Sequence, residues 1–306
     1  MNRREFVAGS AGTLAATLLQ SSLAGTGGVR VGGPIFVEDE DPEVLATAHR
    51  ALGYRAAYCP PLDVRDADRV SATRDAFARH DVAIAEVGRW SNLLDADAGM
   101  RKKNLDAVID GLALAEAVGA RCCVNIAGSF HPTIWYGPHP DNLSPRFLEA
   151  IVDNARTIID AVKPRQARFC YEMMGWSLPD SVDSQLRLLR AVDRAAFGVH
   201  LDPCNLINSP ARFYGNTELL NDCFDRLGAW IVSCHAKDLA WRVGYSVHFE
   251  EVRPGQGSLD YATFLRRLAT LPVETPLMLE HLEGPTEYDQ ARKHVFDKCH
   301  SAGIRF

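Results

Sequence analysis

The chain has 306 residues, of which 47% are hydrophobic and 24% are charged. This composition is typical of a globular protein with a large core, and it excludes an intrinsically disordered chain. The formal net charge is -6, and no stretch is rich enough in lysine and arginine to predict a surface that binds nucleic acid. We therefore expect a small-molecule ligand and no nucleic-acid partner.

The beginning of the chain is predicted to be an export signal. Arg3 and Arg4 precede a moderately apolar run that ends in small residues. This segment resembles a twin-arginine signal, although Asn2 stands where such signals usually have Ser or Thr. The alternative is a chance arginine pair before a core helix. We expect residues 1–24 to be removed by a peptidase, residues 25–306 to form a mature periplasmic protein, and no later segment to span a membrane.

From residue 29 onward, short β-rich runs alternate with longer segments of helical period. The predicted strands are 29–36, 54–59, 82–88, 121–128, 168–174, 197–203, 230–236 and 276–282. The predicted helices are 42–52, 66–80, 101–118, 144–163, 180–194, 217–227, 258–270 and 286–301.

Eight strand–helix pairs in about 280 residues predict an α/β protein, a single (β/α)8 TIM barrel over residues 25–306. The alternative is an open, doubly wound sheet. Such a sheet usually carries a glycine-rich phosphate loop after its first strand, and Gly32 and Gly33 lack the third, spaced glycine. We therefore favour the barrel.

Four charged or titratable side chains end the last four predicted strands. Glu172 ends the fifth in FCYEMM, and the following three strands end with Asp202, His235 and Glu280. In a barrel these strand ends lie side by side on the carboxyl-end rim, where such enzymes place their chemistry. Three carboxylates packed together would repel each other without a cation. Because an oxygen-rich set with one imidazole suits Mn²⁺, Mg²⁺ or Co²⁺ better than a structural zinc site, we predict one divalent metal ion here.

With these motifs in place, the chain resembles the xylose isomerase-like TIM-barrel superfamily of sugar isomerases and epimerases. The resemblance rests on HLDPCN, SCHAKD and LMLEH in that order, and it covers residues 29–306. It implies that Glu172, Asp202, His235 and Glu280 hold one metal ion, with manganese favoured and magnesium, cobalt or zinc as alternatives. It also implies that Glu172 and Glu280 are catalytic, and that they remove and return the proton next to a substrate carbonyl.

The sequence departs from the epimerase pattern at three places. Such epimerases usually have a second acid shortly after the first metal glutamate, where this chain has Trp176 and Leu178. A histidine often stands three residues past the metal aspartate, where this chain has Asn205. An arginine usually follows the metal histidine, and here Lys237 comes early and Arg242 late. The substrate is therefore open, although the metal ligands match.

Further polar and aromatic residues near the same rim are predicted to bind substrate. His131 and Trp135 lie in the long loop after the fourth strand, and loops after barrel strands often carry function. His200 has the same strand phase as Asp202, which predicts a position on the rim or behind it. Together with residues discussed above, the predicted substrate-binding set is His131, Trp135, Trp176, His200, Asn205 and Lys237.

Several functions remain open from the sequence alone. The first is isomerisation or epimerisation of an unphosphorylated monosaccharide, cyclitol or keto-sugar, and the second is elimination of the substituent of a 3-keto-glycoside. A sugar-binding protein with a degenerate site is a third, against which the intact ligand set speaks. A DNA-repair endonuclease would need further His and Glu ligands and a basic groove, which are not visible. We expect a carbohydrate substrate, and a homo-oligomer is compatible with the sequence.

Overall fold

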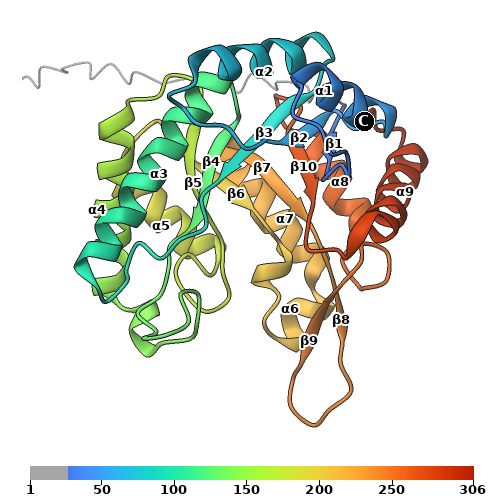
Figure 1. Ribbon diagram of the computed structural model, residues 1–306. Coiled ribbons are helices and arrows are strands. Elements are labelled where there is room, and N and C mark those ends of the chain that lie inside the picture. Colours follow the sequence, from blue (N-terminus) through green and yellow to red (C-terminus); the bar gives the residue numbers. More distant parts are fainter. Residues whose placement is uncertain (1–26) are drawn as a thin grey trace, which may run out of the picture.

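The computed structural model describes residues 27–306, so the predicted export signal lies outside the described residues. Eight parallel strands close into a barrel in the order β1-β10-β7-β6-β5-β4-β3-β2, with helices around it (Figure 1). The strands are β1 (Arg30–Gly32), β2 (Ala56–Tyr58), β3 (Ala83–Gly88), β4 (Cys122–Ile126), β5 (Arg168–Glu172), β6 (Phe197–Leu201), β7 (Ile231–Ala236) and β10 (Pro276–Leu279). The predicted TIM barrel is confirmed.

The helices alternate with the strands as the hydrophobic pattern predicts. They are α1 (Pro42–Ala51), α2 (Ala67–Arg79), α3 (Ala98–Val118), α4 (Pro145–Val162), α5 (Val182–Val192), α6 (Pro210–Tyr214), α7 (Asn216–Leu227), α8 (Tyr261–Ala269) and α9 (Gly284–Ala302). Helix α4 begins with Pro145, and the Ser144 side chain accepts a hydrogen bond from the Phe147 backbone at 3.2 Å. Within the described residues, no helix is both long and apolar enough to cross a bilayer.

A β-hairpin between β7 and α8 was not predicted. It consists of the antiparallel strands β8 (Asp238–Trp241) and β9 (Phe249–Val252), and it projects from the barrel at the carboxyl ends of the strands (Figure 1). The Asp238 carboxylate accepts backbone hydrogen bonds from Gly255 and Gly257 at 3.0 Å and from Leu259 at 2.9 Å. This buried carboxylate fixes the base of the hairpin, so the hairpin has a defined position beside the barrel mouth.

Small side chains fill the inside of the barrel. Ala56, Ala85 and Met278 form one buried cluster there, and Cys122, Val124 and Cys170 form a second. Gly32 is required at its position, because a Cβ atom on it would lie 2.4 Å from the Ala56 carbonyl oxygen. Larger apolar residues pack between the strands and the helices in two clusters. The closely packed interior keeps the strand ends, and the side chains on them, in fixed positions.

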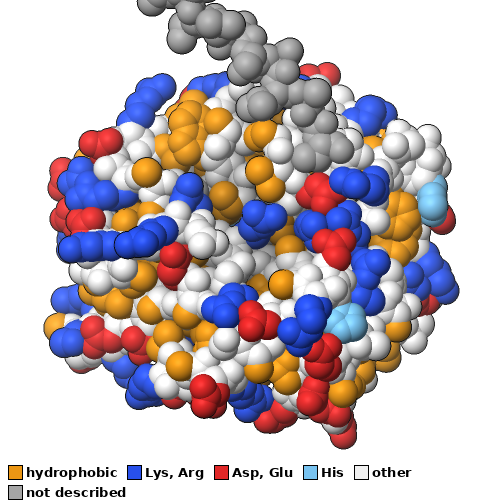
Figure 2. Space-filling model, turned by 90° about the horizontal axis from the view of Figure 1, so that it is seen from above, with side chains coloured by type: hydrophobic (Ala, Val, Ile, Leu, Met, Phe, Trp, Pro, Cys, Tyr) orange, Lys and Arg blue, Asp and Glu red, His pale blue; other side chains and the backbone are white. Residues whose placement is uncertain are grey.

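The opposite end of the barrel carries a network of ion pairs, which we call the amino-end network: Arg30, Arg55, Asp81, Glu274 and Arg305. Arg30 contacts Asp81 at 2.8 Å and Glu274 at 3.2 Å, and Arg55 contacts the same two carboxylates at 2.9 and 3.0 Å. Arg305 also pairs with Glu274. Figure 2 views the molecule from this end, and basic and acidic side chains lie next to each other across the face. These ion pairs link parts of the chain that meet at this end of the barrel: β1, the loops before β2 and β3, and the end of the chain.

Candidate metal centre

The four predicted ligands converge at the carboxyl end of the barrel. Glu172 ends β5, Asp202 directly follows β6, His235 lies on β7 and Glu280 directly follows β10. These strands are consecutive neighbours in the barrel order. One possible ligand atom from each of the four side chains lies within 4.8 Å of the others, and all four side chains are buried. The four side chains therefore lie together at one end of the barrel, as the sequence predicted.

The atoms of the cluster face one another. His235 Nδ1 lies 2.7 Å from Glu280 Oε1, 3.1 Å from Glu172 Oε1 and 3.9 Å from Asp202 Oδ2. The other oxygen of Asp202 accepts a backbone hydrogen bond from Cys204 at 3.0 Å, which fixes the direction of the carboxylate. Asp202 Oδ2 and Glu280 Oε1 are buried and accept no hydrogen bond. In the structure the Lys237 ammonium group lies beside both oxygens, 2.7 Å from Asp202 Oδ2 and 2.6 Å from Glu280 Oε1, and a bound metal cation would be an alternative partner for them.

The buried charged groups of the cluster shift one another's pKa values. Burial raises the pKa of Asp202, and although Lys237 opposes this, the neighbouring carboxylates of Glu172 and Glu280 contribute to a pKa of about 6. Burial alone would lower the pKa of His235, but the carboxylates around it, Glu86 among them, raise this pKa well above its usual value. The cluster therefore holds more negative charge than its own protein partners neutralise.

Lys237 is the cation closest to the carboxylates. Its Nζ atom lies 2.7 Å from Asp202 Oδ2, 2.6 Å from Glu280 Oε1 and 3.8 Å from Glu172 Oε1. The side chain is only 4% exposed, and these carboxylates raise its pKa although burial alone would lower it. Lys237 thus lies among the predicted metal ligands, and it also lines the cavity in which a substrate was predicted to bind.

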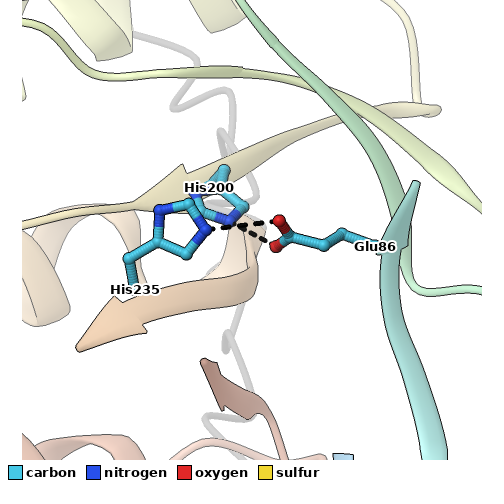
Figure 3. A group of neighbouring side chains, drawn as sticks. All are labelled: Glu86, His200 and His235. Carbon is cyan, nitrogen blue, oxygen red and sulfur yellow. Dashed lines mark hydrogen bonds and ion pairs between the residues drawn. The ribbon is translucent and has the colours of Figure 1, made fainter. Parts of the chain in front are cut away.

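Glu86 is a residue of the centre that was not predicted. It lies on β3, across the barrel from His200 on β6 and His235 on β7 (Figure 3). Its Oε2 lies 2.7 Å from His200 Nε2, and its Oε1 lies 3.2 Å from His235 Nε2. Ser233 donates a further hydrogen bond at 3.2 Å. Because Glu86 engages Nε2 of His235, Nδ1 of the same ring is the nitrogen that faces Glu172 and the other carboxylates.

A cavity of about 750 Å³ opens above the centre. Glu172, Glu280, Glu86 and Lys237 form its polar floor. The remaining lining residues are Tyr58, Cys59, Gly88, Trp90, Ile126, Trp135, Tyr136, Met174, Asn205, Glu251, His281 and Tyr288. Apolar and aromatic walls with a few converging polar groups are typical of a small-molecule site.

The family assignment rests on a match that covers most of the barrel. Residues 46–298 match the model of the xylose isomerase-like TIM barrel family. The chain belongs to this family. No curated protein sequence shows significant similarity to the chain.

Solved structures of the same fold agree with this assignment. A xylose isomerase-like TIM barrel protein from Mycobacterium smegmatis in complex with magnesium has 16% identity and a TM-score of 0.62, with 90% of this chain and 97% of that chain covered. The 3-keto-D-glucoside 4-epimerase from E. coli has 13% identity and a TM-score of 0.63, covering 88% and 99%. D-Psicose 3-epimerase from Clostridium cellulolyticum has 12% identity and a TM-score of 0.63, covering 91% and 100%. At these identities the likeness concerns the fold.

Three of the six predicted substrate-binding residues line the cavity of this xylose isomerase-like barrel, namely Trp135, Asn205 and Lys237. Asn205 Nδ2 donates a hydrogen bond to Glu172 Oε1 at 3.0 Å, so it orients a ligand carboxylate. The substitution of Asn for the usual histidine thus preserves a polar contact with the centre.

The other three predicted substrate-binding residues do not line the cavity. His131 Nδ1 accepts hydrogen bonds from the backbone of Thr133 and Ile134 at 3.2 and 2.9 Å, so this ring stabilises its own loop. Trp176 is 63% exposed and lies outside the cavity lining. His200 is fully buried behind the metal ligands and bonded to Glu86, which corresponds to the position behind the rim that its strand phase allows. For these three, the structure provides no direct route to a substrate in the cavity.

Two further polar residues of the cavity were not predicted, namely Glu251, which lies on the hairpin that was missed, and His281, which follows Glu280. Glu251 lies on β9, and its carboxylate is 3.2 Å from His281 Nδ1. His281 follows Glu280 directly and has a φ of 58°, a left-handed conformation that is uncommon for a residue other than glycine. The hairpin therefore brings an additional acid to the mouth of the site, next to a residue held in a strained conformation.

Proposed function

We propose that the protein is a divalent-metal-dependent enzyme that transfers a proton on the carbon next to a carbonyl group of a carbohydrate, as a sugar isomerase or epimerase does. The observation that carries the proposal is the cluster of Glu172, Asp202, His235 and Glu280, of which Glu172 and Glu280 line a cavity of about 750 Å³. The likeness in fold to a keto-glucoside epimerase and to D-psicose 3-epimerase supports it.

The residues of the cluster fit a divalent cation. Three carboxylates and one imidazole provide an oxygen-rich set, and two of their buried oxygens accept no hydrogen bond. A divalent ion held there would draw electron density from a chelated hydroxy-ketone and so make the neighbouring C–H more acidic. We place manganese first. Magnesium, cobalt and zinc are alternatives, because all of them accept mixed oxygen and nitrogen ligands.

Two glutamates are placed to move the proton. Both Glu172 and Glu280 line the cavity and come from different parts of the rim, β5 and the end of β10. Burial tends to raise the pKa of each, but neighbouring cations keep it below its ordinary value, so both are ionised, which is the state from which a general base acts. Asn205 holds Glu172 in place. We propose that one glutamate removes the proton and that the other returns one.

The cavity favours an uncharged substrate. Among residues 27–306, no arginine lines it, and the one lysine that does, Lys237, is already engaged with the carboxylates of Asp202 and Glu280. Phosphate groups are usually held by such cations or by helix N-termini. Trp90, Trp135 and Tyr136 offer aromatic faces on the wall, which suit the apolar face of a sugar ring. We propose an unphosphorylated monosaccharide, cyclitol or keto-sugar.

A second activity of the same site is elimination from a 3-keto-glycoside. The same proton removal next to the ketone would expel the glycosidic substituent from the adjacent carbon. Two observations favour it: Asp180, the next acid after Glu172, does not line the cavity, and the cavity is of the size typical of ligands larger than one sugar ring. Epimerisation and elimination both begin with removal of the proton next to the carbonyl group. Only the product, an epimer or a released substituent, distinguishes the two reactions.

The proposal is tested by hydrogen exchange. Metal-loaded protein is incubated in D₂O with ketoses, inososes and 3-keto-glycosides, and deuterium at the carbon next to the carbonyl is measured by NMR. We expect exchange with at least one class, together with an isomer, an epimer or a released substituent. Absence of exchange with all three classes, in protein that has bound metal, would overturn the proposed chemistry.

We also propose that the protein is exported by the twin-arginine route and acts in the periplasm. The arginine pair Arg3 and Arg4 is the feature that supports this. Replacing both arginines with lysine should leave the precursor in the cytoplasm, as fractionation would show. Unchanged export of that variant would rule the route out.

A further inference from the structure

Lys237 holds a position that a sugar-binding lysine does not require. Its ammonium group lies 2.7 Å from Asp202 Oδ2 and 2.6 Å from Glu280 Oε1, the two buried oxygens of the cluster that accept no hydrogen bond. Glu280 Oε1 is also the oxygen nearest to His235 Nδ1, at 2.7 Å. The lysine and a divalent ion would therefore contact the same oxygens.

The position of Lys237 is fixed by the chain on both sides. Its backbone oxygen accepts a hydrogen bond from the Tyr261 hydroxyl at 2.8 Å, and the next residue, Asp238, is held by three backbone hydrogen bonds from the segment after β9. The backbone therefore cannot move away easily. The side chain has four flexible carbon–carbon bonds and lines the cavity, so the ammonium group can turn toward the open space.

The charges of the ligand set indicate why a lysine stands here. The three ligand carboxylates carry three negative charges, and a buried, unpaired charge is costly. Lys237 supplies one positive charge. A divalent ion supplies two more, so the ion and Lys237 together neutralise the three ligand carboxylates, and neither does so alone.

From this geometry we infer that Lys237 is a built-in counter-ion of the metal centre, which pairs with Asp202 and Glu280 while no metal is bound and competes with the ion for them. It thereby stabilises the metal-free protein and weakens metal binding. A bound ion would repel the ammonium group of Lys237 toward the cavity that this side chain lines, where it would be free to contact a substrate. The inference rests on the proposed metal centre and deepens it.

The opposite role for the lysine is that it organises the carboxylates for the ion. The two roles predict effects of opposite sign on metal affinity. Replacing a competing cation with a neutral side chain tightens metal binding, whereas replacing an organising one weakens it. Activity does not separate the two, because loss of Lys237 would reduce turnover in both cases.

The test compares wild type with Lys237→Met and Lys237→Gln. The dissociation constant for Mn²⁺ is measured by competition with a chelator, and the melting temperature is measured with and without Mn²⁺. We expect both variants to bind Mn²⁺ at least about 10-fold more tightly, because a like charge close to the ion is removed. We also expect a lower melting temperature without metal and a larger rise on adding it.

Two matched variants serve as controls. Lys237→Arg keeps the positive charge and should retain the weak binding of the wild type. Lys103→Met removes an exposed lysine of α3 and should leave both measurements unchanged. If Lys237→Met does not fold without metal, it and Lys237→Gln are produced in the presence of Mn²⁺. Failure of both to fold even then would overturn the inference.

The outcomes separate the inference from the proposed function. Equal or weaker Mn²⁺ binding by both neutral variants would overturn the counter-ion role and leave the metal centre intact. Absence of Mn²⁺ binding by wild type and by all variants would overturn the metal centre, and with it the proposed function.

Discussion

At the amino end of the barrel three arginines face two carboxylates, whereas at the carboxyl end three ligand carboxylates face one lysine. In the amino-end network each carboxylate contacts at least two arginines, although Arg30 Nε is buried without a hydrogen-bond partner. In the cluster of Glu172, Asp202, His235 and Glu280 the ratio is reversed, because three carboxylates share the ammonium group of one lysine, Lys237. Both ends are rich in charge, and the proposed metal ion would balance the excess of carboxylates at the carboxyl end.

The pKa values express the same difference. Burial tends to raise the pKa of Glu274 and of Asp202 alike. Arginines around Glu274 reverse this tendency and lower its pKa, whereas Lys237 does not suffice to do so for Asp202, next to two further carboxylates. A carboxylate that its neighbours stabilise is structural, and one that its neighbours destabilise is a candidate for function.

The largest effect is expected from the two glutamates of the unbalanced end. Glu172→Gln and Glu280→Gln keep a neutral oxygen ligand but remove the base, so turnover should fall by about 10²–10⁴-fold while part of the metal is retained. Steady-state kinetics with metal analysis checks this. If both glutamates shuttle protons, one variant should still exchange substrate hydrogen with D₂O. Near-normal turnover of both variants with metal restored would mean that the glutamates are ligands only.

The next effect is one of stability and depends on pH. The pKa of Asp202 in the folded protein is about 6, above its ordinary value, so between these values the metal-free native state binds more protons than the unfolded state. Its stability therefore falls as the pH rises through this window. Asp202→Asn should make the metal-free protein more stable by about 2–3 kcal/mol at pH 7, with little gain near pH 4.

Chemical denaturation of the metal-free protein at the two pH values measures this effect. The same variant should lose its metal, as elemental analysis would show. A variant less stable than wild type at neutral pH would mean that Asp202 is already balanced by Lys237, and the contrast between the two ends would fail.

A smaller effect on metal affinity is expected from Glu86, which contacts the His235 ring from the side opposite the predicted ligand carboxylates. Glu86→Gln removes the carboxylate that engages Nε2 of His235 and His200, so it should weaken metal binding by about 10- to 100-fold. The expected loss is in metal affinity, measured by chelator competition, with a native circular dichroism spectrum. Ser233→Ala removes only the weaker contact to Glu86 and should change the affinity less. Unchanged affinity in Glu86→Gln would show that Glu86 acts on packing alone.

The smallest effect is expected from the amino-end network. Glu274→Gln should lower the free energy of unfolding by about 1–2 kcal/mol, because three arginines lose one charged contact each while Arg30 and Arg55 keep Asp81, and it should leave metal binding unchanged. Asp81→Asn affects a half-exposed carboxylate and should cost less. Urea unfolding and metal titration check both variants. A change in metal affinity would show that the two ends are coupled through the strands.

The sequence by itself predicted the barrel and the four ligands. Strand and helix periods are local properties of the chain, and each ligand follows an apolar run, so eight alternating elements already determine that Glu172, Asp202, His235 and Glu280 meet on one rim. Element ends differ by a few residues, as for β10, which ends at Leu279. The resemblance to the xylose isomerase-like TIM-barrel superfamily rested on the same local motifs, and the family match over residues 46–298 confirms membership of that family.

Only the tertiary structure decided which side chains surround those ligands. Glu86 is a single acid in an apolar strand, and the sequence does not reveal that it reaches across the barrel to two histidines. The β8–β9 hairpin depends on Asp238, whose backbone partners are 17 to 21 residues away. Lys237 was predicted to face substrate, and its contacts with Asp202 and Glu280 join separate strands. Periodicity reports on neighbours along the chain, whereas these contacts depend on distances set by the closure of the barrel.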